Sequence, residues 1–219
     1  VLDAIKKNYQ GFKHLWGAFN KTHNEHLLSK KNPKIIFLSR NNLLKSRISF
    51  RIALTTQIWT TKNKLPVNEC KKITLNYKFE PIIVNELKKG LQELNDSKKY
   101  YKQFLTKNKI PFFEITYEEL YGPKISIDKK VKKIQEIFEF LGYERINDPK
   151  ILEKIKGILD YKKRKMNDFE TYMKIPNILE IEDKLGNKET GYLFNSQAKL
   201  KISKIKLNKI KNKLNNNEK

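Results

Sequence analysis

Cysteine is nearly absent from this chain of 219 residues, because Cys70 is the only one. A single thiol cannot build a disulfide framework or a thiolate metal site, which excludes the disulfide-rich secreted class. We therefore expect a reducing compartment such as the cytoplasm. Long apolar runs are also lacking, since no stretch approaches the ~20 residues of a transmembrane helix, and no signal peptide is recognisable. The sequence predicts a globular protein that does not span a membrane.

Glycine is scarce as well, with 8 residues in the whole chain. No stretch matches the G-x-x-x-x-G-K-[ST] pattern of a phosphate-binding loop, which counts against a P-loop kinase within these residues. The sequence starts with Val1 and not with methionine, and its first residues have the pattern of the middle of a secondary-structure element. We therefore expect an N-terminal segment to precede it, and a phosphate-binding loop in that segment would keep the kinase open.

Acidic residues are few relative to basic ones, with 24 Asp and Glu against 47 Lys and Arg and a net charge of +23. Such an excess fits an anionic ligand, a nucleic acid or an acidic surface. However, Lys, Asn and Ile recur throughout, as expected of an AT-rich genome, and the basic residues are not gathered with aromatics on one stripe. We therefore favour compositional bias. A basic, non-enzymatic nucleic-acid-binding protein is the alternative from a different class.

The most informative stretch begins with the apolar run Ile35–Leu38, which predicts a short buried strand. Apolar residues then recur at helical spacing, and Asn41 or Asn42 is placed to cap, so a helix should run to about Thr60. Ligands of open α/β sheets lie beyond the carboxyl ends of the strands. This rule places Arg40 at the ligand-binding edge.

Further along, apolar patterns predict a second buried strand at 110–117 and helices at 16–29, 81–107, 129–141, 149–159 and 176–185. Ser126 or Asp128 can cap the 129–141 helix, and Gly142 can end it. A short strand is expected at 11–15, an exposed loop at 62–70 and an extended segment at 71–76. Strands alternating with helices indicate βαβ units and a mostly parallel sheet. We expect one α/β domain over residues 1–195 and a Lys/Asn/Ile-rich tail over 196–219.

A set of short segments follows in a definite order: Gly11-Phe12-Lys13, Ile35 to Arg40 with Asn42 and Ser49, Thr56-Gln57-Ile58-Trp59, Ile115 to Leu120, Phe138 to Gly142, Ile175-Pro176-Asn177, and Gly191-Tyr192-Leu193. In this order and spacing, the segments resemble the bacterial sulfotransferases that use 3′-phosphoadenosine 5′-phosphosulfate (PAPS). The trehalose and nodulation-factor sulfotransferases are the most similar group. The resemblance covers about residues 11–194.

This resemblance implies a P-loop NTPase-like three-layer fold, with a mostly parallel sheet flanked by helices. It also implies transfer of a sulfuryl group from PAPS to a hydroxyl of an acceptor, by resemblance a carbohydrate or glycolipid. The 3′-phosphate of PAPS is assigned to Arg40, Asn42 and Ser49. A guanidinium fork, a short hydroxyl and helix-terminal amides suit such a dianion. The alternative is an ion pair of Arg40 with a surface carboxylate and a helix-face position for Ser49.

Other site residues carry weaker signals. Arg164 and Lys165 are candidates for a late basic contact with the 3′-phosphate, and Lys13 and Trp59 are candidates for the acceptor site. His14 is the candidate general base for the acceptor hydroxyl, although a packed or surface histidine is the preferred interpretation. The catalytic residue is therefore left unassigned.

The reaction implied by the resemblance needs no metal, and we expect no metal site. His23 and His26 have helical spacing but no third ligand. Glu118 and Glu119 are expected to support the fold. The family's R-[ST]-G-[ST]-like loop for the 5′-phosphosulfate has no match here and would precede every matched segment. We therefore expect it before Val1, together with the first strand.

Residues 1–219 should then hold only the 3′-phosphate half of the PAPS site. Without the 5′-phosphosulfate loop, we expect these residues to be inactive by themselves. The nearest alternative by fold is a P-loop kinase-like phosphotransferase. A small-molecule or carbohydrate acceptor is expected as partner, nucleic acid is disfavoured, and a homodimer is left open.

Overall fold

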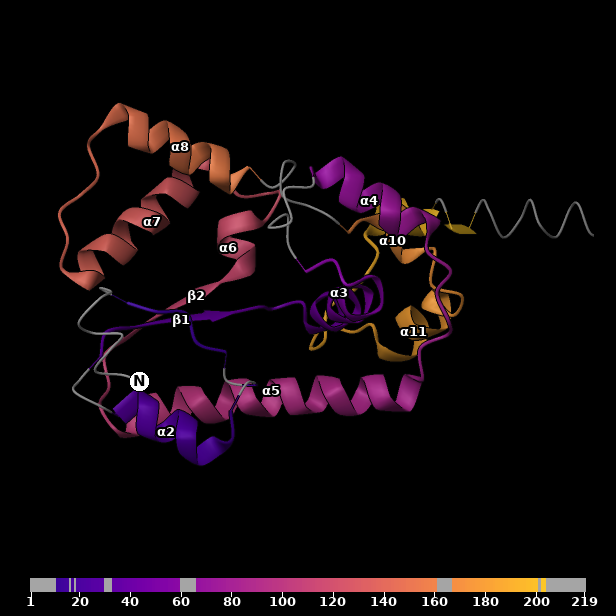
Figure 1. Ribbon diagram of the computed structural model, residues 1–219, viewed down its shortest axis with the longest axis horizontal. Helices are drawn as coiled ribbons and strands as arrows, with labels where there is room; N and C mark the ends of the chain where they lie inside the picture. Colours follow the sequence, from indigo (N-terminus) through magenta and orange to yellow (C-terminus); the bar gives the residue numbers. More distant parts are fainter. Residues whose placement is uncertain are drawn as a thin grey trace, which may run out of the picture.

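The computed structural model describes residues 11–15, 17, 19–29, 33–59, 66–160, 167–200 and 202–203. Its elements in chain order are α2 (Lys21–Ser29), β1 (Ile35–Ser39), α3 (Leu43–Thr56), α4 (Val67–Asn76), α5 (Val84–Lys107), β2 (Phe112–Thr116), α6 (Tyr117–Tyr121), α7 (Ile127–Leu141), α8 (Pro149–Leu159), α10 (Phe169–Tyr172) and α11 (Ile178–Leu185). Figure 1 shows the two strands with α2 and α5 on one side and with α6, α7 and α8 on the other.

The strands β1 and β2 pair in parallel, with Ile35 opposite Phe112 and Ser39 opposite Thr116. A parallel pair needs a long crossover connection, and here the chain passes through α3, α4 and α5 between the strands. The predicted α/β class and parallel pairing are therefore confirmed, as a two-stranded sheet flanked by helices in the described part of the chain. Because the strands run the same way, their carboxyl ends meet at one edge.

Local sequence signals located several element ends correctly. Asn42 is the N-cap of α3, and its side-chain oxygen accepts a hydrogen bond from the Lys45 amide at 2.8 Å. Ser126 caps α7, and Gly142 ends that helix in the left-handed conformation with φ of 93°. Short polar side chains and glycine are preferred at these positions for local reasons. Such ends can therefore be predicted without tertiary information.

Two predicted extended segments are wrong. Residues 11–15 form neither a strand nor a helix. The segment 71–76 is not extended, because it forms α4 together with residues 67–70. Cys70 and Thr74 are both buried in this helix. Their spacing of four residues gives α4 one buried side, a pattern too short to stand out in the sequence.

The helix predicted from Pro81 starts later, at Val84. Asn177 explains the delay, because it holds the backbone of Ile82 from both sides. The Ile82 amide donates to Asn177 Oδ1 at 2.9 Å, and Asn177 Nδ2 donates to the Ile82 carbonyl at 2.8 Å. This pair of hydrogen bonds from a distant residue keeps Ile82 out of the helix.

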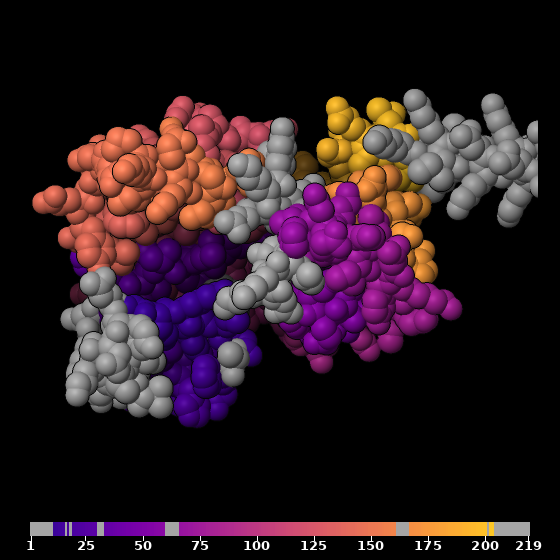
Figure 2. Space-filling view, turned by 45° about the horizontal axis from the view of Figure 1, so that its top comes forward, coloured from indigo at the N-terminus to yellow at the C-terminus, as the bar shows by residue number. Residues whose placement is uncertain are grey.

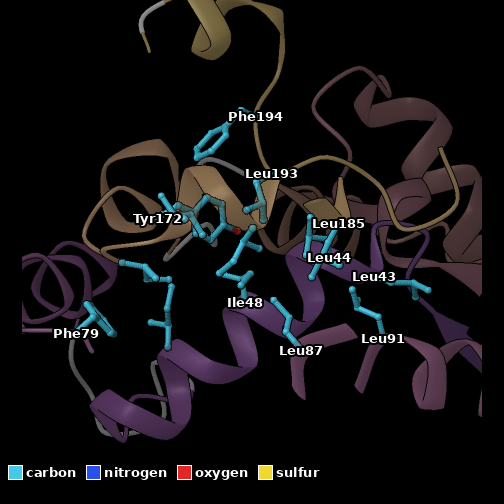
Figure 3. Close-up of a cluster of buried hydrophobic side chains, with 14 of the residues drawn as sticks. Leu43, Leu44, Ile48, Phe79, Leu87, Leu91, Tyr172, Leu185, Leu193 and Phe194 are labelled. Carbon is cyan, nitrogen blue, oxygen red and sulfur yellow. The ribbon is translucent and has the colours of Figure 1, made fainter. Parts of the chain in front are cut away.

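The longest helix, α5, contacts two separate hydrophobic clusters. Its 24 residues span ~36 Å at 1.5 Å per residue. Leu87 and Leu91 belong to a cluster that also contains side chains of α3, α10, α11 and residues 193–194 (Figure 3). Tyr101 and Leu105, near its other end, pack with Phe37 of β1. The helix thereby connects the sheet to the region around α3.

The C-terminal described residues lie at the end of the molecule opposite α7 and α8 (Figure 2). Residues 196–200 are helical, and Ala198 and Ile202 pack on the cluster around α3. The start of the predicted tail thus contacts the core. The rest of that tail, residues 204–219, lies outside the described residues.

The segment 187–194 closes over the start of α3. The Leu44 amide donates to the Thr190 carbonyl at 2.9 Å, and Asn42 Nδ2 donates to the Tyr192 carbonyl at 2.8 Å. Gly191 lies between these contacts with φ of 84°, and a Cβ at this position would lie 2.5 Å from Asn42 Cγ. Both the backbone conformation and the close approach therefore require glycine.

We expect Gly191→Ala to lower the free energy of unfolding by about 1–3 kcal/mol, because it adds a Cβ at positive φ and against Asn42. Urea denaturation followed by circular dichroism measures the change. Gly157→Ala in α8 is the matched control, since a Cβ there meets nothing within 4 Å. The control should be neutral or stabilising by up to about 1 kcal/mol. Equal effects of the two substitutions would contradict the required role of Gly191.

Candidate functional site

The candidate site lies where the carboxyl ends of β1 and β2 meet. Ser39 ends β1 opposite Thr116, which ends β2. The next residues of the two strands, Arg40 and Tyr117, are therefore neighbours, and the Arg40 guanidinium carbon lies 4.5 Å from the centroid of the Tyr117 ring. This is the edge at which ligands bind in open α/β sheets.

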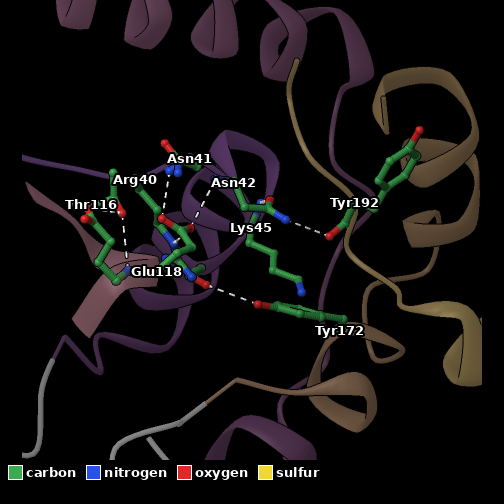
Figure 4. Close-up of polar contacts among 10 residues, drawn as sticks. Arg40, Asn41, Asn42, Lys45, Thr116, Glu118, Tyr172 and Tyr192 are labelled. Carbon is green, nitrogen blue, oxygen red and sulfur yellow. Dashed lines mark hydrogen bonds and ion pairs between the residues drawn. The ribbon is translucent and has the colours of Figure 1, made fainter. Parts of the chain in front are cut away.

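The carboxylate of Glu118 binds the turn between β1 and α3 (Figure 4). The Asn41 amide donates to Glu118 Oε2 at 2.9 Å, and the Asn42 amide donates to Glu118 Oε1 at 3.2 Å. Arg40 Nε lies 3.8 Å from Oε1, which makes an ion pair with a side chain that is 34% exposed. An anionic group of the chain itself thus occupies the amides at the start of α3.

Arg40 is held between Glu118 and Tyr117, but its hydrogen bonding is incomplete. Its Nε is buried and has no hydrogen-bond acceptor among the described residues. The ion pair at 3.8 Å is longer than a hydrogen bond. A buried guanidinium donor without an acceptor is costly. The position is therefore suited to a further acceptor, such as an oxygen of an anionic ligand.

Two hydroxyl groups also contact each other in this region. Ser49 Oγ on α3 lies 3.4 Å from the hydroxyl of Tyr172 on α10, and Tyr172 is 4% exposed. Figure 4 shows the Tyr172 hydroxyl pointing toward the Arg40–Glu118 region. Burial raises the pKa of Tyr172, while the Ser49 hydrogen bond and the positive charge of Arg40 lower it in part. Tyr172 is therefore a neutral hydroxyl donor at neutral pH.

Thr116 and Glu119 fix the short helix α6, which carries Glu118. The Thr116 hydroxyl oxygen accepts from the Glu119 amide at 3.2 Å, and the Thr116 amide donates to Glu119 Oε2 at 2.8 Å. This reciprocal pair is a capping box. The geometry agrees with the expectation that Glu119 supports the fold.

The polar atoms of Asn42 are engaged within the chain. Its side-chain oxygen binds the Lys45 amide, and its side-chain nitrogen binds the Tyr192 carbonyl. Its main-chain amide binds Glu118. Asn42 therefore lies at the start of α3, as predicted, and its side chain holds that helix end in position. Its main-chain amide is the group that faces the Glu118 carboxylate.

The remaining predicted residues are not brought to Arg40 by any contact found in the described part of the chain. His14 Nε2 lies 2.7 Å from Asn24 Oδ1, and its ring stacks on Phe19 at 5.5 Å. Lys13 is exposed. Trp59 is 47% exposed and contacts the Phe50 ring edge-on at 5.6 Å. Arg164 and Lys165 lie outside the described residues.

Sequence reasoning did not single out Tyr172 or Tyr117 for this site. Tyr117 follows a predicted strand, so the strand-end rule that located Arg40 also applied to it. Tyr172 carries no such signal, because it reaches Ser49 from a short helix that is distant in sequence. Glu118 was expected only to support the fold.

Comparisons with protein-family models, with curated proteins and with solved structures found no match for this chain. Among the described residues, no group of three or more His, Cys, Asp or Glu side chains is placed to hold a metal ion. No helix in that part of the chain is both long enough and apolar enough to cross a membrane. The geometry of the strand edge is therefore the basis for assigning a function.

We expect Glu119→Gln to reduce stability at neutral pH, with a difference that disappears in acid. The hydrogen bond from the Thr116 amide lowers the pKa of Glu119, although burial opposes it and the Thr116 hydroxyl and Lys133 assist it. A carboxylate with a lowered pKa stabilises the folded state above its unfolded pKa of about 4.3, and this contribution is lost as the pH falls through the folded pKa.

Urea denaturation of both proteins between about pH 7 and pH 3 measures this difference in the free energy of unfolding. Glu80→Gln removes a charge from an exposed side chain ahead of α5 and serves as the control. A difference between wild type and Glu119→Gln that persists unchanged at the lowest pH would contradict the assigned role.

Proposed function

We propose that this protein is a PAPS-dependent sulfotransferase whose described residues bind the 3′-phosphate of PAPS. The acceptor in this proposal is a hydroxyl of a carbohydrate or glycolipid. The observation that carries the proposal is the buried Arg40 Nε without an acceptor, beside two backbone amides that already bind a carboxylate. A phosphate oxygen would complete the hydrogen bonding of Arg40.

The residues at the strand edge suit a nucleotide phosphate both by their hydrogen-bond donors and by their position. Arg40 offers a planar set of donors that matches phosphate oxygens. The amides of Asn41 and Asn42 precede α3, where the helix dipole favours an anion. The hydroxyls of Ser49 and Tyr172 contact each other nearby. Together these groups would bind and orient PAPS and neutralise its charge.

PAPS, when bound, would supply the activated sulfuryl group. The acceptor oxygen would bond to its sulfur as the bond from sulfur to the 5′-phosphate oxygen breaks and 3′,5′-adenosine bisphosphate leaves; the hydroxyl proton would pass to a general base, for which no residue is assigned. Positioning and charge neutralisation are the protein's contribution to such a transfer. Three of the segments that resemble sulfotransferases also meet in space. Asn42 binds the Tyr192 carbonyl, and Glu118 binds the Asn41 amide. This convergence of distant segments supports the proposal.

The proposal includes a P-loop NTPase-like fold. In such a fold the parallel pair β1–β2, its helical crossover and the ligand at the strand ends would belong to one βαβ unit. The two-stranded sheet and its flanking helices are compatible with that arrangement.

We expect 3′,5′-adenosine bisphosphate to raise the melting temperature of the protein in a saturable way. Arg40→Ala should weaken this binding roughly 10- to 150-fold, because a hydrogen bond to a charged group contributes about 1.5–3 kcal/mol. Thermal denaturation over a nucleotide titration measures both affinities. Adenosine 5′-monophosphate, which lacks the 3′-phosphate, should give a smaller shift.

Arg51→Ala is the matched control, because Arg51 lies on α3, the helix that follows Arg40, and its exposed side chain pairs with Glu86 at 3.0 Å. The control should leave the bisphosphate affinity unchanged. No saturable shift, or an equal loss in both variants, would contradict the 3′-phosphate assignment. Stabilisation by any nucleic acid that vanishes steeply with salt would favour the nucleic-acid-binding alternative instead.

A further inference from the structure

The donors that the proposed function assigns to a phosphate are already in use. Glu118 accepts from the Asn41 amide at 2.9 Å and from the Asn42 amide at 3.2 Å. It also lies 3.8 Å from Arg40 Nε. A carboxylate and a phosphate are both anions, so they compete for the same donors and repel each other at short range. Both cannot occupy the turn before α3 together.

We propose that Glu118 is an internal competitor that occupies the anion site until a ligand phosphate displaces it. This inference rests on the proposed function for the identity of the ligand, and it concerns how that site is regulated. The Glu118 carboxylate takes the place of the phosphate in the unliganded chain. Binding of a phosphate then requires the Glu118 side chain to turn away toward solvent.

The structure permits that movement without unfolding α6. Glu118 is 34% exposed, so its carboxylate has a path to water. The cap of α6 is made by Thr116 and Glu119 and does not involve the Glu118 side chain. The Glu118 carbonyl accepts from the Gly122 amide at 2.8 Å and belongs to the helix itself. Only side-chain rotation is therefore needed to free the two amides.

Displacement leaves Arg40 with a better partner than it had before. Its Nε is buried and has no hydrogen-bond acceptor in the described part of the chain while Glu118 lies at 3.8 Å. A tetrahedral anion offers more acceptor oxygens than a carboxylate and can bind the amides and the guanidinium together. Competition by Glu118 then excludes weak monoanions and admits ligands with stronger charge.

Removal of the competitor should leave a site that inorganic sulfate can fill. We expect Glu118→Ala to lower the melting temperature and sulfate to restore most of the loss in a saturable way. Sodium chloride at matched ionic strength should not restore it. Wild type should respond to the same titration only at higher sulfate concentrations, because sulfate must first displace the Glu118 carboxylate from the donors. Differential scanning fluorimetry of the full chain measures the melting temperature of Glu118→Ala alone, with sulfate and with sodium chloride, and that of wild type with sulfate.

Glu86→Ala is the matched control, because Glu86 is an exposed carboxylate in the first turn of α5 that pairs with Arg51 of α3 at 3.0 Å. This substitution removes the same charge, and sulfate should raise the melting temperature of Glu86→Ala no more than that of wild type.

The double variant Arg40→Ala/Glu118→Ala should lose the sulfate rescue. Glu118→Gln keeps the size of the side chain and serves if Glu118→Ala does not fold. This variant should bind sulfate roughly tenfold more tightly than wild type, because the like charge is gone.

Two results with sulfate would overturn the inference. One is a loss of stability in Glu118→Ala and Glu118→Gln that sulfate does not relieve, which would make Glu118 a structural link only. The other is an equal sulfate response in wild type. The test is independent of the nucleotide: sulfate rescue without any effect of 3′,5′-adenosine bisphosphate would reject the proposed function and retain the competitor. Bisphosphate binding of equal affinity in wild type and Glu118→Gln would retain the function and reject the competitor.

Discussion

The hydrogen bonds from the Asn41 and Asn42 amides to Glu118 join the turn before α3 to the helix α6. They connect the residue after the start of α6 to the turn before α3, and so they tie the end of β2 to the end of β1. Parallel pairing of the strands makes this possible, because it brings both carboxyl ends to one edge. The direction of α3 is set at this turn, and the cluster of Leu44, Ile48 and Ile52 packs according to that direction.

Under the proposed function, the same contact would relate folding to ligand binding. Amides ahead of a helix are good donors to any anion, and the chain satisfies them with a carboxylate of its own. Under the proposed competition, this carboxylate would contribute to stability in the free protein. It would also discriminate among ligands, because each must replace an existing partner. The buried Nε of Arg40 has no hydrogen bond to this carboxylate, so in the proposal a ligand with more acceptor oxygens would be favoured.

Much of the local structure follows from short-range rules, and the exceptions have tertiary causes. The apolar run before Arg40 and the cap at Asn42 are local signals, and both elements formed where expected. The late start of α5 was not predictable, because Asn177 binds Ile82 from 95 residues away in sequence. Likewise α4 depends on burial of Cys70 and Thr74. For the candidate site, the strand-end rule located Arg40, whereas Tyr172 reaches Ser49 from a distant short helix.

By itself, the sequence determined the class of the fold, the capped ends of α3 and α7, and the presence of a cation at a strand end. Those properties depend on periodicity, caps and side-chain charge, which act over a few residues. Tertiary structure alone decided which partner that cation has. Arg40 pairs with Glu118, and Gly191 closes on Asn42, because strand pairing and core packing bring together residues that no local pattern relates. Whether Arg40 forms an ion pair within the chain or binds an anionic ligand is therefore decided by the folded structure and not by the local sequence.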